Sequence, residues 1–475
     1  MPPPIKPGEF LPLHPEYAKL VTARAFWRLT FRTGRDYVDG RDAKGEPVLY
    51  AHEREREGYN RRKRTTKPRN HAGPIIRRYN DFVFRTEATR PKESVPAEYD
   101  VLKEDADGHG TPLPKFMREV VLAAQIDRDA YILPDSTKRP DAGPMSKAQA
   151  AAAGVRTVLK RVDADAVAWW RDYDGAMVEA IVIMEREDGS CFGRWYGAKD
   201  MMEFDLDQQE SASNWRVTAV RPVVKHGYDS CPLVRCRPPF DGESQISPLA
   251  ESQQAITNYI SLLNEEIFNV CFSQIVATGV AASDVKDVVL GNNRLLCLPN
   301  PGAKFEVIGA DPAQAESIRK AIEDEQRELY RIAGVQSGDP TASPAAPESG
   351  VAKAFKFNDL AANLASLAQA AEDAENRAVA LALAPVTADA PVCEYPQEFD
   401  LPELTAELAD VIKITAALAV PTVVKRKVVE RFVARNFKLT DEEQTELEGQ
   451  LADLEIDPAS ADSNNPFPRR TSAGT

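Results

Sequence analysis

Side chains that could perform covalent chemistry or bind a metal are scattered along this chain of 475 residues. The six cysteines form no CxxC pair and have no regular spacing, which is typical of reduced thiols. Cys231 and Cys236 lie close together and follow His226, but these residues do not complete the four ligands of a zinc site. We therefore expect no metal and no cofactor.

Motifs for nucleotide and hydrolytic chemistry are missing from the sequence. It has no GxxxxGK[ST] phosphate loop, no HExxH zinc motif and no GxSxG nucleophile turn. The five histidines have no catalytic partner close by in the sequence, and acidic pairs such as Asp205/Asp207 are common on solvated surfaces. We therefore expect that the protein is not an enzyme.

The segment DADGHG, which begins at Asp105, resembles the start of a calcium-binding loop. In such a loop the twelfth position supplies a bidentate glutamate, but here that position is Phe116. We interpret the segment as a turn.

A dense basic run covers residues 54–78 and has the sequence Arg61-Arg62-Lys63-Arg64 at its centre. It could bind phosphate groups, or it could form a solvated surface balanced by Glu53, Glu55 and Glu57. We favour the solvated surface. The formal net charge of −14 also disfavours a surface that grips polyanions.

The elements that would position any site are mainly long helices. Residues 313–334 place Ile318, Ile322, Leu329 and Ile332 on one face, and charged residues lie on the others. Residues 351–384 carry a stripe of small and apolar side chains: Leu360, Leu364, Leu367, Ala371, Ala374, Ala378 and Leu381. The loop between the two helices, residues 335–350, contains three prolines and two glycines, and loops of this length are usually functional or linkers.

A further helix is predicted over residues 247–275, with Ser247 as the N-cap and Pro248 at the first helical position. Residues 276–312 form a compact insert with a predicted hairpin between residues 294–298 and 304–308. No membrane span is expected, because polar residues interrupt the most apolar window at 267–282. The N-terminus also lacks the apolar run of a signal peptide.

Short strands are predicted between residues 157 and 238, where the hydrophobic period becomes two. The expected strands are residues 158–170, 177–187, 191–196, 215–224 and 233–236, and Trp169 and Trp170 are expected at the core and rim of their sheet. Because no helices intervene, the sheet should be antiparallel. Helices are also predicted at residues 113–125, 403–418, 422–437 and 441–454, and the fold class is α+β.

This order of elements resembles that of tailed-bacteriophage portal proteins, the head-to-tail connector family. Ser247-Pro248-Leu249 looks like the start of the first stem helix, QRELYRIAGV at residues 326–335 looks like the end of the second, and residues 349–383 look like the long helix after the tunnel loop. The N-terminal passage also resembles a subgroup of portals, through Tyr59, Arg77, Tyr79, Asn80, Phe82, Phe84 and residues 105–136.

The resemblance implies a portal-like architecture with named regions. Residues 1–246 would be an antiparallel-sheet wing with helices, 247–275 stem helix 1, 276–312 a small α/β clip and 313–334 stem helix 2. Residues 335–350 would be the tunnel loop, 351–399 the long helix and strand of the wing, and 400–475 a helical crown with a disordered tail.

The resemblance also implies a function in the virion. Portals form rings of about twelve subunits at one capsid vertex, where DNA is packaged and ejected through the channel. The expected partners are further copies of the chain, the terminase large subunit, the major capsid or scaffolding protein, a head-tail adaptor and double-stranded DNA that passes through non-specifically. The protein would be made in the host cytoplasm. The alternatives are a nucleic-acid-processing enzyme and another oligomeric head-tail component of the virion.

Candidate site residues follow from this reading. The DNA channel would involve the loop residues Gly338, Asp339, Ser343 and Glu348, the following Lys353 and Lys356, and the stem residues Arg319, Lys320, Arg327 and Arg331. The stem cations could face DNA or pair with acids of a neighbouring subunit, and both readings stay open. Leu296, Phe305 and Val307 of the clip would lie at the subunit interface.

Overall fold

The computed structural model describes residues 5–52, 56–91, 95–137, 154–173, 175–186, 188–208, 214–240, 243–271, 274–279, 302, 304–308, 312–334, 350–384, 386–387, 389–397, 399, 422–436 and 449. The chain divides into two compact units, Met1–Phe399 and Asp400–Thr475.

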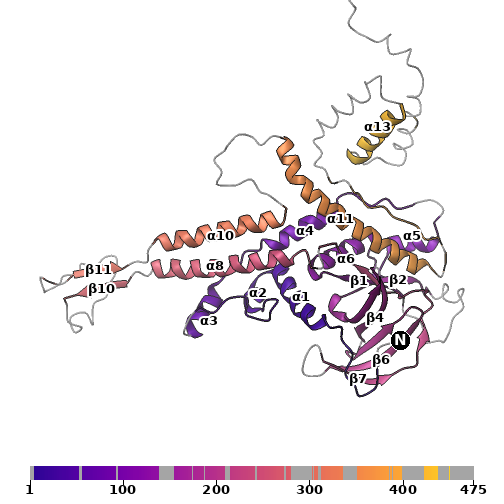
Figure 1. Cartoon of the computed structure of the whole chain (residues 1–475), viewed down its shortest axis with the longest axis horizontal. Coiled ribbons are helices and arrows are strands. Elements are labelled where there is room, and N and C mark those ends of the chain that lie inside the picture. Colours follow the sequence, from indigo (N-terminus) through magenta and orange to yellow (C-terminus); the bar gives the residue numbers. More distant parts are fainter. Residues whose placement is uncertain are drawn as a thin grey trace, which may run out of the picture. The chain divides into compact units, whose positions relative to one another are not determined.

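The first unit combines helices with antiparallel sheets, which confirms the predicted α+β class (Figure 1). Its N-terminal helices are α1 (Tyr17–Arg32), α2 (Arg35–Asp39), α3 (Arg56–Thr65), α4 (Ala72–Val83), α5 (Ala97–Glu104) and α6 (Leu113–Asp127). Three longer helices follow the sheets: α8 (Ser247–Cys271), α10 (Pro312–Ile332) and α11 (Gly350–Leu383). The predicted helices at residues 113–125, 313–334 and 351–384 are confirmed.

The strands form three sheets. One has the order β2-β1-β9, with β1 (Ala130–Ser136), β2 (Thr157–Val162) and β9 (Val234–Cys236). The largest has the order β3-β4-β5-β6-β7, with β8 beside β6; its strands are β3 (Val167–Tyr173), β4 (Ala176–Glu185), β5 (Cys191–Tyr196), β6 (Asp200–Gln208), β7 (Trp215–Val220) and β8 (Val224–Lys225). The third pairs β10 (Gln274–Thr278) with β11 (Lys304–Ile308). All described pairings are antiparallel, as predicted.

Strand β1 lies between two hydrophobic cores. Alternate side chains of a strand point to opposite faces. Ile132 belongs to the core that the helices build, whereas Tyr131 and Leu133 belong to the core under the larger sheet. Trp170 is buried in the second core and stacks on His14, with ring centroids 3.7 Å apart, while Trp169 packs at its edge.

A cluster of buried charges joins the helices of the first unit to its sheets. Arg24 of α1 is fully buried; it donates to the backbone carbonyls of Asp127 and Ala164 at 3.0 Å and pairs with Asp129 at 3.4 Å. Burial alone would raise the pKa of Asp129, but the hydrogen bond and charge of Arg237 hold that pKa below its ordinary value. Buried charges that are paired in this way link the helices to the sheets.

One strand prediction is wrong, and one strand was missed. Residues 158–170 do not form one strand, because the 3-10 turn Ala164–Ala166 separates β2 from β3 and places them in different sheets. Arg24 holds that turn by its bond to the carbonyl of Ala164. Strand β6 was not predicted, although Met202, Phe204 and Leu206 alternate with acids and point into the core.

In the second unit the described helix is α13 (Thr422–Asn436), which confirms the helix predicted at residues 422–437. The helices predicted at 403–418 and 441–454 lie outside the described residues. Across the described part of the chain, no helix has both the length and the apolar character needed to cross a bilayer.

Candidate functional site: a helix pair and its base

Helices α8 and α10 run antiparallel and side by side, and β10 and β11 pair at one end of them (Figure 1). The register joins Gln274 to Ile308 and Thr278 to Lys304. The predicted helix over residues 247–275 therefore ends earlier, at Cys271, and Ile275 is a strand residue. The described partner of residues 304–308 is β10, whereas residues 294–298, the predicted partner, lie outside the described part.

The start of α8 differs in detail from the prediction. Ser247 is the first helical residue, and its hydroxyl donates to Glu243 at 3.1 Å. The side-chain oxygen of Ser244 accepts the N–H of Ser247 at 3.1 Å. The capping oxygen therefore comes from Ser244, not from Ser247.

The apolar residues of α10, which recur every three, four or seven positions, form the face that packs against the helical core. Ile322 and Leu329 are buried in the helical core, and Ile318 packs at its edge. Ile332, at the end of the stripe, remains 38% exposed. The apolar stripe of α11 is likewise buried as predicted, except for Leu381, which is partly buried.

A row of buried amide side chains fixes α8 to the N-terminal part of the unit. Asn258 donates to the carbonyl of Val48 at 2.9 Å and accepts the N–H of Tyr50 at 2.8 Å. Gln253 accepts the N–H of His71 at 2.9 Å. Because these side chains bind backbone groups that would otherwise be buried without partners, they hold α8 in one position. This helix was predicted from its first residues, whereas the row of amide side chains was not predicted.

Residues at the centre of the basic run also attach α8 to the N-terminal part of the unit. Arg62 is 1% exposed, donates to Ser261 of α8 at 2.8 Å and also donates to the carbonyl of Tyr50. Arg61 pairs with Glu265 of α8 at 3.0 Å, and Lys63 pairs with Asp39 at 3.0 Å. The preferred reading of a solvated surface is therefore wrong for Arg62, which packs α3 against α8.

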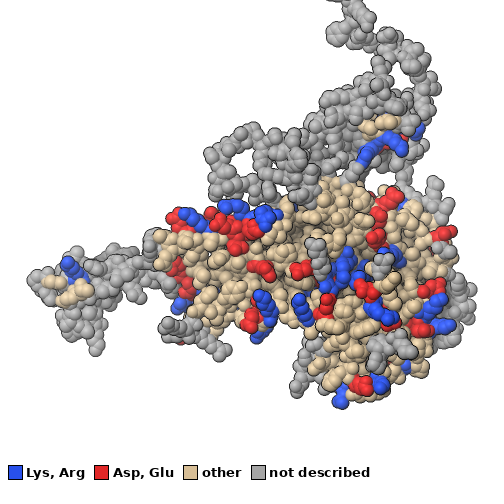
Figure 2. All heavy atoms as spheres, in the orientation of Figure 1, with Lys and Arg blue, Asp and Glu red and all other residues tan. Residues whose placement is uncertain are grey.

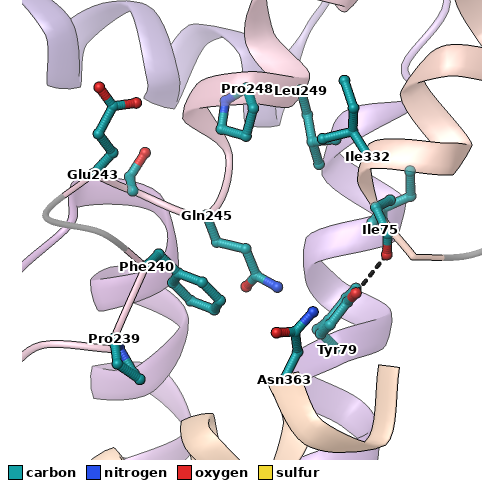
Figure 3. Close-up of a pocket in the computed structure, with 12 residues that line it drawn as sticks. Ile75, Tyr79, Pro239, Phe240, Glu243, Gln245, Pro248, Leu249, Ile332 and Asn363 are labelled. Atoms are coloured by element: carbon teal, nitrogen blue, oxygen red, sulfur yellow. Dashed lines mark hydrogen bonds between the residues drawn. The ribbon is translucent and has the colours of Figure 1, made fainter. Parts of the chain in front are cut away.

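The end of α10 is held by α4. The hydroxyl of Tyr79 donates to the carbonyl of Ala333, and burial raises the pKa of Tyr79 to about 12, so the donor stays protonated at neutral pH (Figure 3). His71, at the start of α4, lies 3.3 Å from the side-chain nitrogen of Gln326 and meets the ring of Tyr330 edge-on. Burial, then the charge of Arg69, lowers the pKa of His71.

A cavity of about 480 Å³ lies beside this contact. Figure 3 shows Tyr79 and Ile75 of α4, Ile332 of α10 and Asn363 of α11 around it, with Phe240, Gln245 and Pro248 from the start of α8 and the segment before it. The cavity therefore lies where four parts of the first unit meet, next to the point at which α10 ends.

The exposed face of α10 carries charges of both signs (Figure 2). Lys320 pairs with Glu316 at 3.6 Å, Arg327 with Asp324 at 2.9 Å and Arg331 with Glu328 at 2.6 Å, all within the helix; Arg319 is exposed. Acids of the same helix thus pair three of the four candidate stem cations. Exposed pairs of this kind are weak and can exchange partners.

The other candidate residues are only partly described. Gly338, Asp339, Ser343, Glu348 and Leu296 lie outside the described residues. Lys353 and Lys356 are in α11 and Phe305 and Val307 are in β11, but their side chains are not described. Their assignment to a channel or an interface stays a prediction.

The candidate metal sites have structural explanations. Asp105 accepts the N–H groups of Gly108 and Gly110 at 2.9 and 2.8 Å, so its carboxylate closes the predicted turn. Burial raises the pKa of Cys231 to about 11 and that of Cys236 to about 12, so both thiols stay protonated. Among the described residues no group of His, Cys, Asp or Glu could hold a metal ion.

Comparisons with known proteins give structural similarities only. No protein-family model matches the sequence, and no curated protein matches it. A chain from the neck of an empty GTA particle with C6 symmetry is 13% identical, with a TM-score of 0.43 over 80% of this chain and 90% of that one. A chain from the virion of a native gene transfer agent particle is 12% identical, with a TM-score of 0.42 over 93% and 96%. A chain from the neck of a native GTA particle with C12 symmetry is 11% identical, with a TM-score of 0.42 over 91% and 97%.

Proposed function

We propose that this protein is a phage portal protein, which forms a ring of about twelve subunits at one capsid vertex. The ring is the channel through which double-stranded DNA is packaged and ejected, and it is the docking site for the terminase large subunit and for tail or adaptor proteins. Its other protein partner is the major capsid or scaffolding protein. The role is structural and not enzymatic, and the protein belongs to the virion.

The observation that carries this proposal is the antiparallel pair of α8 and α10 with β10 and β11 at one end, followed directly by α11. The order of these elements is the one that a portal stem, clip and long wing helix require. Residues 335–349, between α10 and α11, occupy the place in that order of a tunnel loop.

The charges of α10 are compatible with a channel through which DNA moves. A DNA channel must let a polyanion slide, and a surface of unpaired cations would bind phosphates and slow it. On α10 the cations Lys320, Arg327 and Arg331 are each paired with a nearby acid of the same helix. With a chain charge of −14, such a surface holds DNA only weakly.

Ring assembly tests the proposal. The full chain should sediment as a large assembly, native mass spectrometry should give one mass of about twelve chains, and negative-stain images along the axis should show rings with a central hole. Only monomers and dimers at micromolar concentration, across several salt concentrations, would overturn the proposal.

The channel role has a separate test. Replacing residues 338–349 with a short Gly-Ser bridge should leave the rings intact, because the flanking helices are anchored elsewhere. Particles assembled with this variant should package or retain less DNA. A normal DNA content in particles with confirmed rings would exclude a channel role for the loop.

A further inference from the structure

Part of the basic run is not used in packing. Whereas Arg61, Arg62 and Lys63 attach α3, the run ends on α4, where Arg77 and Arg78 are exposed and Arg85 follows just after the helix. Within the described residues, neither the Arg78 nor the Arg85 side chain has a hydrogen bond or an ion pair. Two free guanidinium groups thus lie on the exposed side of α4 and just beyond its end.

These arginines belong to a shallow groove of about 550 Å³ on α4, lined by Pro74, Arg77, Arg78, Asp81, Phe82 and Arg85. The spacing of these positions, three or four residues apart, places them on one helical face. The opposite face, with Ile75, Ile76 and Tyr79, is buried in the helical core, so the groove rests on a fixed support.

Other contacts hold the groove in shape. The guanidinium carbon of Arg77 lies 4.7 Å from the centre of the Phe31 ring, in a cation–π contact that leaves its N–H groups free to bind. Asp81 is paired with Arg118 of α6. Three arginines therefore line the groove together with one aspartate that is already paired with Arg118, so the groove is positive on a chain that is negative as a whole.

We propose that this face of α4 docks an acidic amphipathic helix of a partner protein. Arg85 follows Arg78 by seven residues and lies two residues beyond the end of α4; at the helical rise of 1.5 Å per residue the separation is roughly 10 Å, which matches two carboxylates seven residues apart on a partner helix. Phe82, between the two arginines, and Pro74, one turn before Arg78, offer apolar groups that fit an apolar side chain of the partner.

A protein fits this face better than a nucleic acid does. The phosphate backbone would present no apolar group to Phe82, and it would approach the carboxylate of Asp81, which repels it. Carboxylates at defined positions can contact Arg78 and Arg85 and avoid Asp81. The groove does not depend on the proposed channel function, because α4 and its contacts with Phe31 and Arg118 lie within one chain.

The test uses the full-length protein and a labelled synthetic peptide that forms a helix with two glutamates seven residues apart and a leucine between them. Fluorescence anisotropy at low salt should show saturable binding. The double variant Arg78→Glu/Arg85→Glu should weaken it by at least about ten-fold, because it places repulsive charges opposite both carboxylates. The control variant Lys19→Glu/Arg377→Glu makes the same change in net charge at exposed positions on α1 and α11, and it should weaken binding by less than about two-fold.

Three results would overturn the proposal. The first is no binding of the peptide by the wild-type protein. The second is an equal loss in the control variant, which would mean that only net charge matters. The third is a short DNA duplex that binds through Arg78 and Arg85 when the peptide does not, which would assign the groove to nucleic acid. Circular dichroism of each variant confirms that it is folded.

Discussion

The contact between Tyr79 and the end of α10 gives a direct test of the site. Tyr79 is 3% exposed, and its hydroxyl donates to the carbonyl of Ala333, the first residue after α10. Substituting Tyr79→Phe removes the hydroxyl and leaves the ring in the core. The contact between α4 and the end of α10 should weaken, while the rest of the core keeps its packing.

The magnitude follows from the surroundings of the carbonyl. A net hydrogen bond contributes about 0.5–1.5 kcal/mol, and an acceptor left without a partner in a dry core adds about 1–3 kcal/mol. The cavity of about 480 Å³ beside Ala333 can admit water to that carbonyl, which removes most of the second cost. We therefore expect a loss of about 1 kcal/mol, or about a five-fold rise in local opening.

Hydrogen exchange measures this opening. In the native protein the N–H of Ala333 donates to Leu329 and that of Gly334 donates to Arg331, each at 3.0 Å, so both amides report on the last turn. Their exchange should rise about five-fold in Tyr79→Phe and stay unchanged in Tyr50→Phe, because Tyr50 is 46% exposed. Unchanged exchange at both amides, or an equal rise throughout the protein, would refute the reasoning.

Two further changes probe the supports of the helix pair, and a third probes the packing of the larger sheet. Arg62→Met should lower the free energy of unfolding by about 1.5–3 kcal/mol, because it removes buried bonds from a charged donor to α8 and the 48–50 segment. His71→Gln should abolish a loss of stability below about pH 6.5: the folded pKa of His71 is lowered, so its contribution is present above the unfolded pKa and is lost as pH falls through the folded value. Gly193→Ala should cost about 1–3 kcal/mol, because the new Cβ would lie 2.1 Å from the ring of Phe204.

The first two of these changes have a matched control, and the third has a rescue variant. Arg64→Met alters an exposed residue of the same helix and should leave the unfolding free energy unchanged. His109→Gln should keep the acid-dependent loss of stability. Adding Phe204→Leu to Gly193→Ala should recover part of the loss, because the smaller side chain makes room. A control that behaves like its test variant contradicts the corresponding explanation.

The sequence predicted the long helices well because their patterns are local. The stripe from Leu360 to Ala378 repeats every three or four residues, and every one of its members is buried in α11. Strand β6 shows the same kind of local signal at period two, through Met202, Phe204 and Leu206, and it could have been found.

The remaining features depend on contacts between distant residues. The break between β2 and β3 is set by Arg24, which lies 140 positions away from Ala164 in the chain. From the sequence, Arg62 is expected to be a surface cation. Its burial depends on Ser261, which lies 199 positions away in the chain. No periodicity carries such information, since a buried arginine and an exposed one have the same local sequence signal.

The two helices are attached to the rest of the unit at different places. The attachments of α8 run from Gln253 to Glu265, along its middle, and those of α10 run from Gln326 to Ala333, at the end away from β11. At the other end the helices reach the two-stranded sheet, and an isolated strand pair of this size is marginally stable in water. In a ring, neighbouring subunits would supply the missing support, so assembly would stiffen β10 and β11. The attached parts of α8 and α10 would keep the geometry that each chain forms alone. Variants of the attachment residues, such as Arg62 and Tyr79, should therefore act on the single subunit. Variants of β10 and β11 should act on the assembly of the ring.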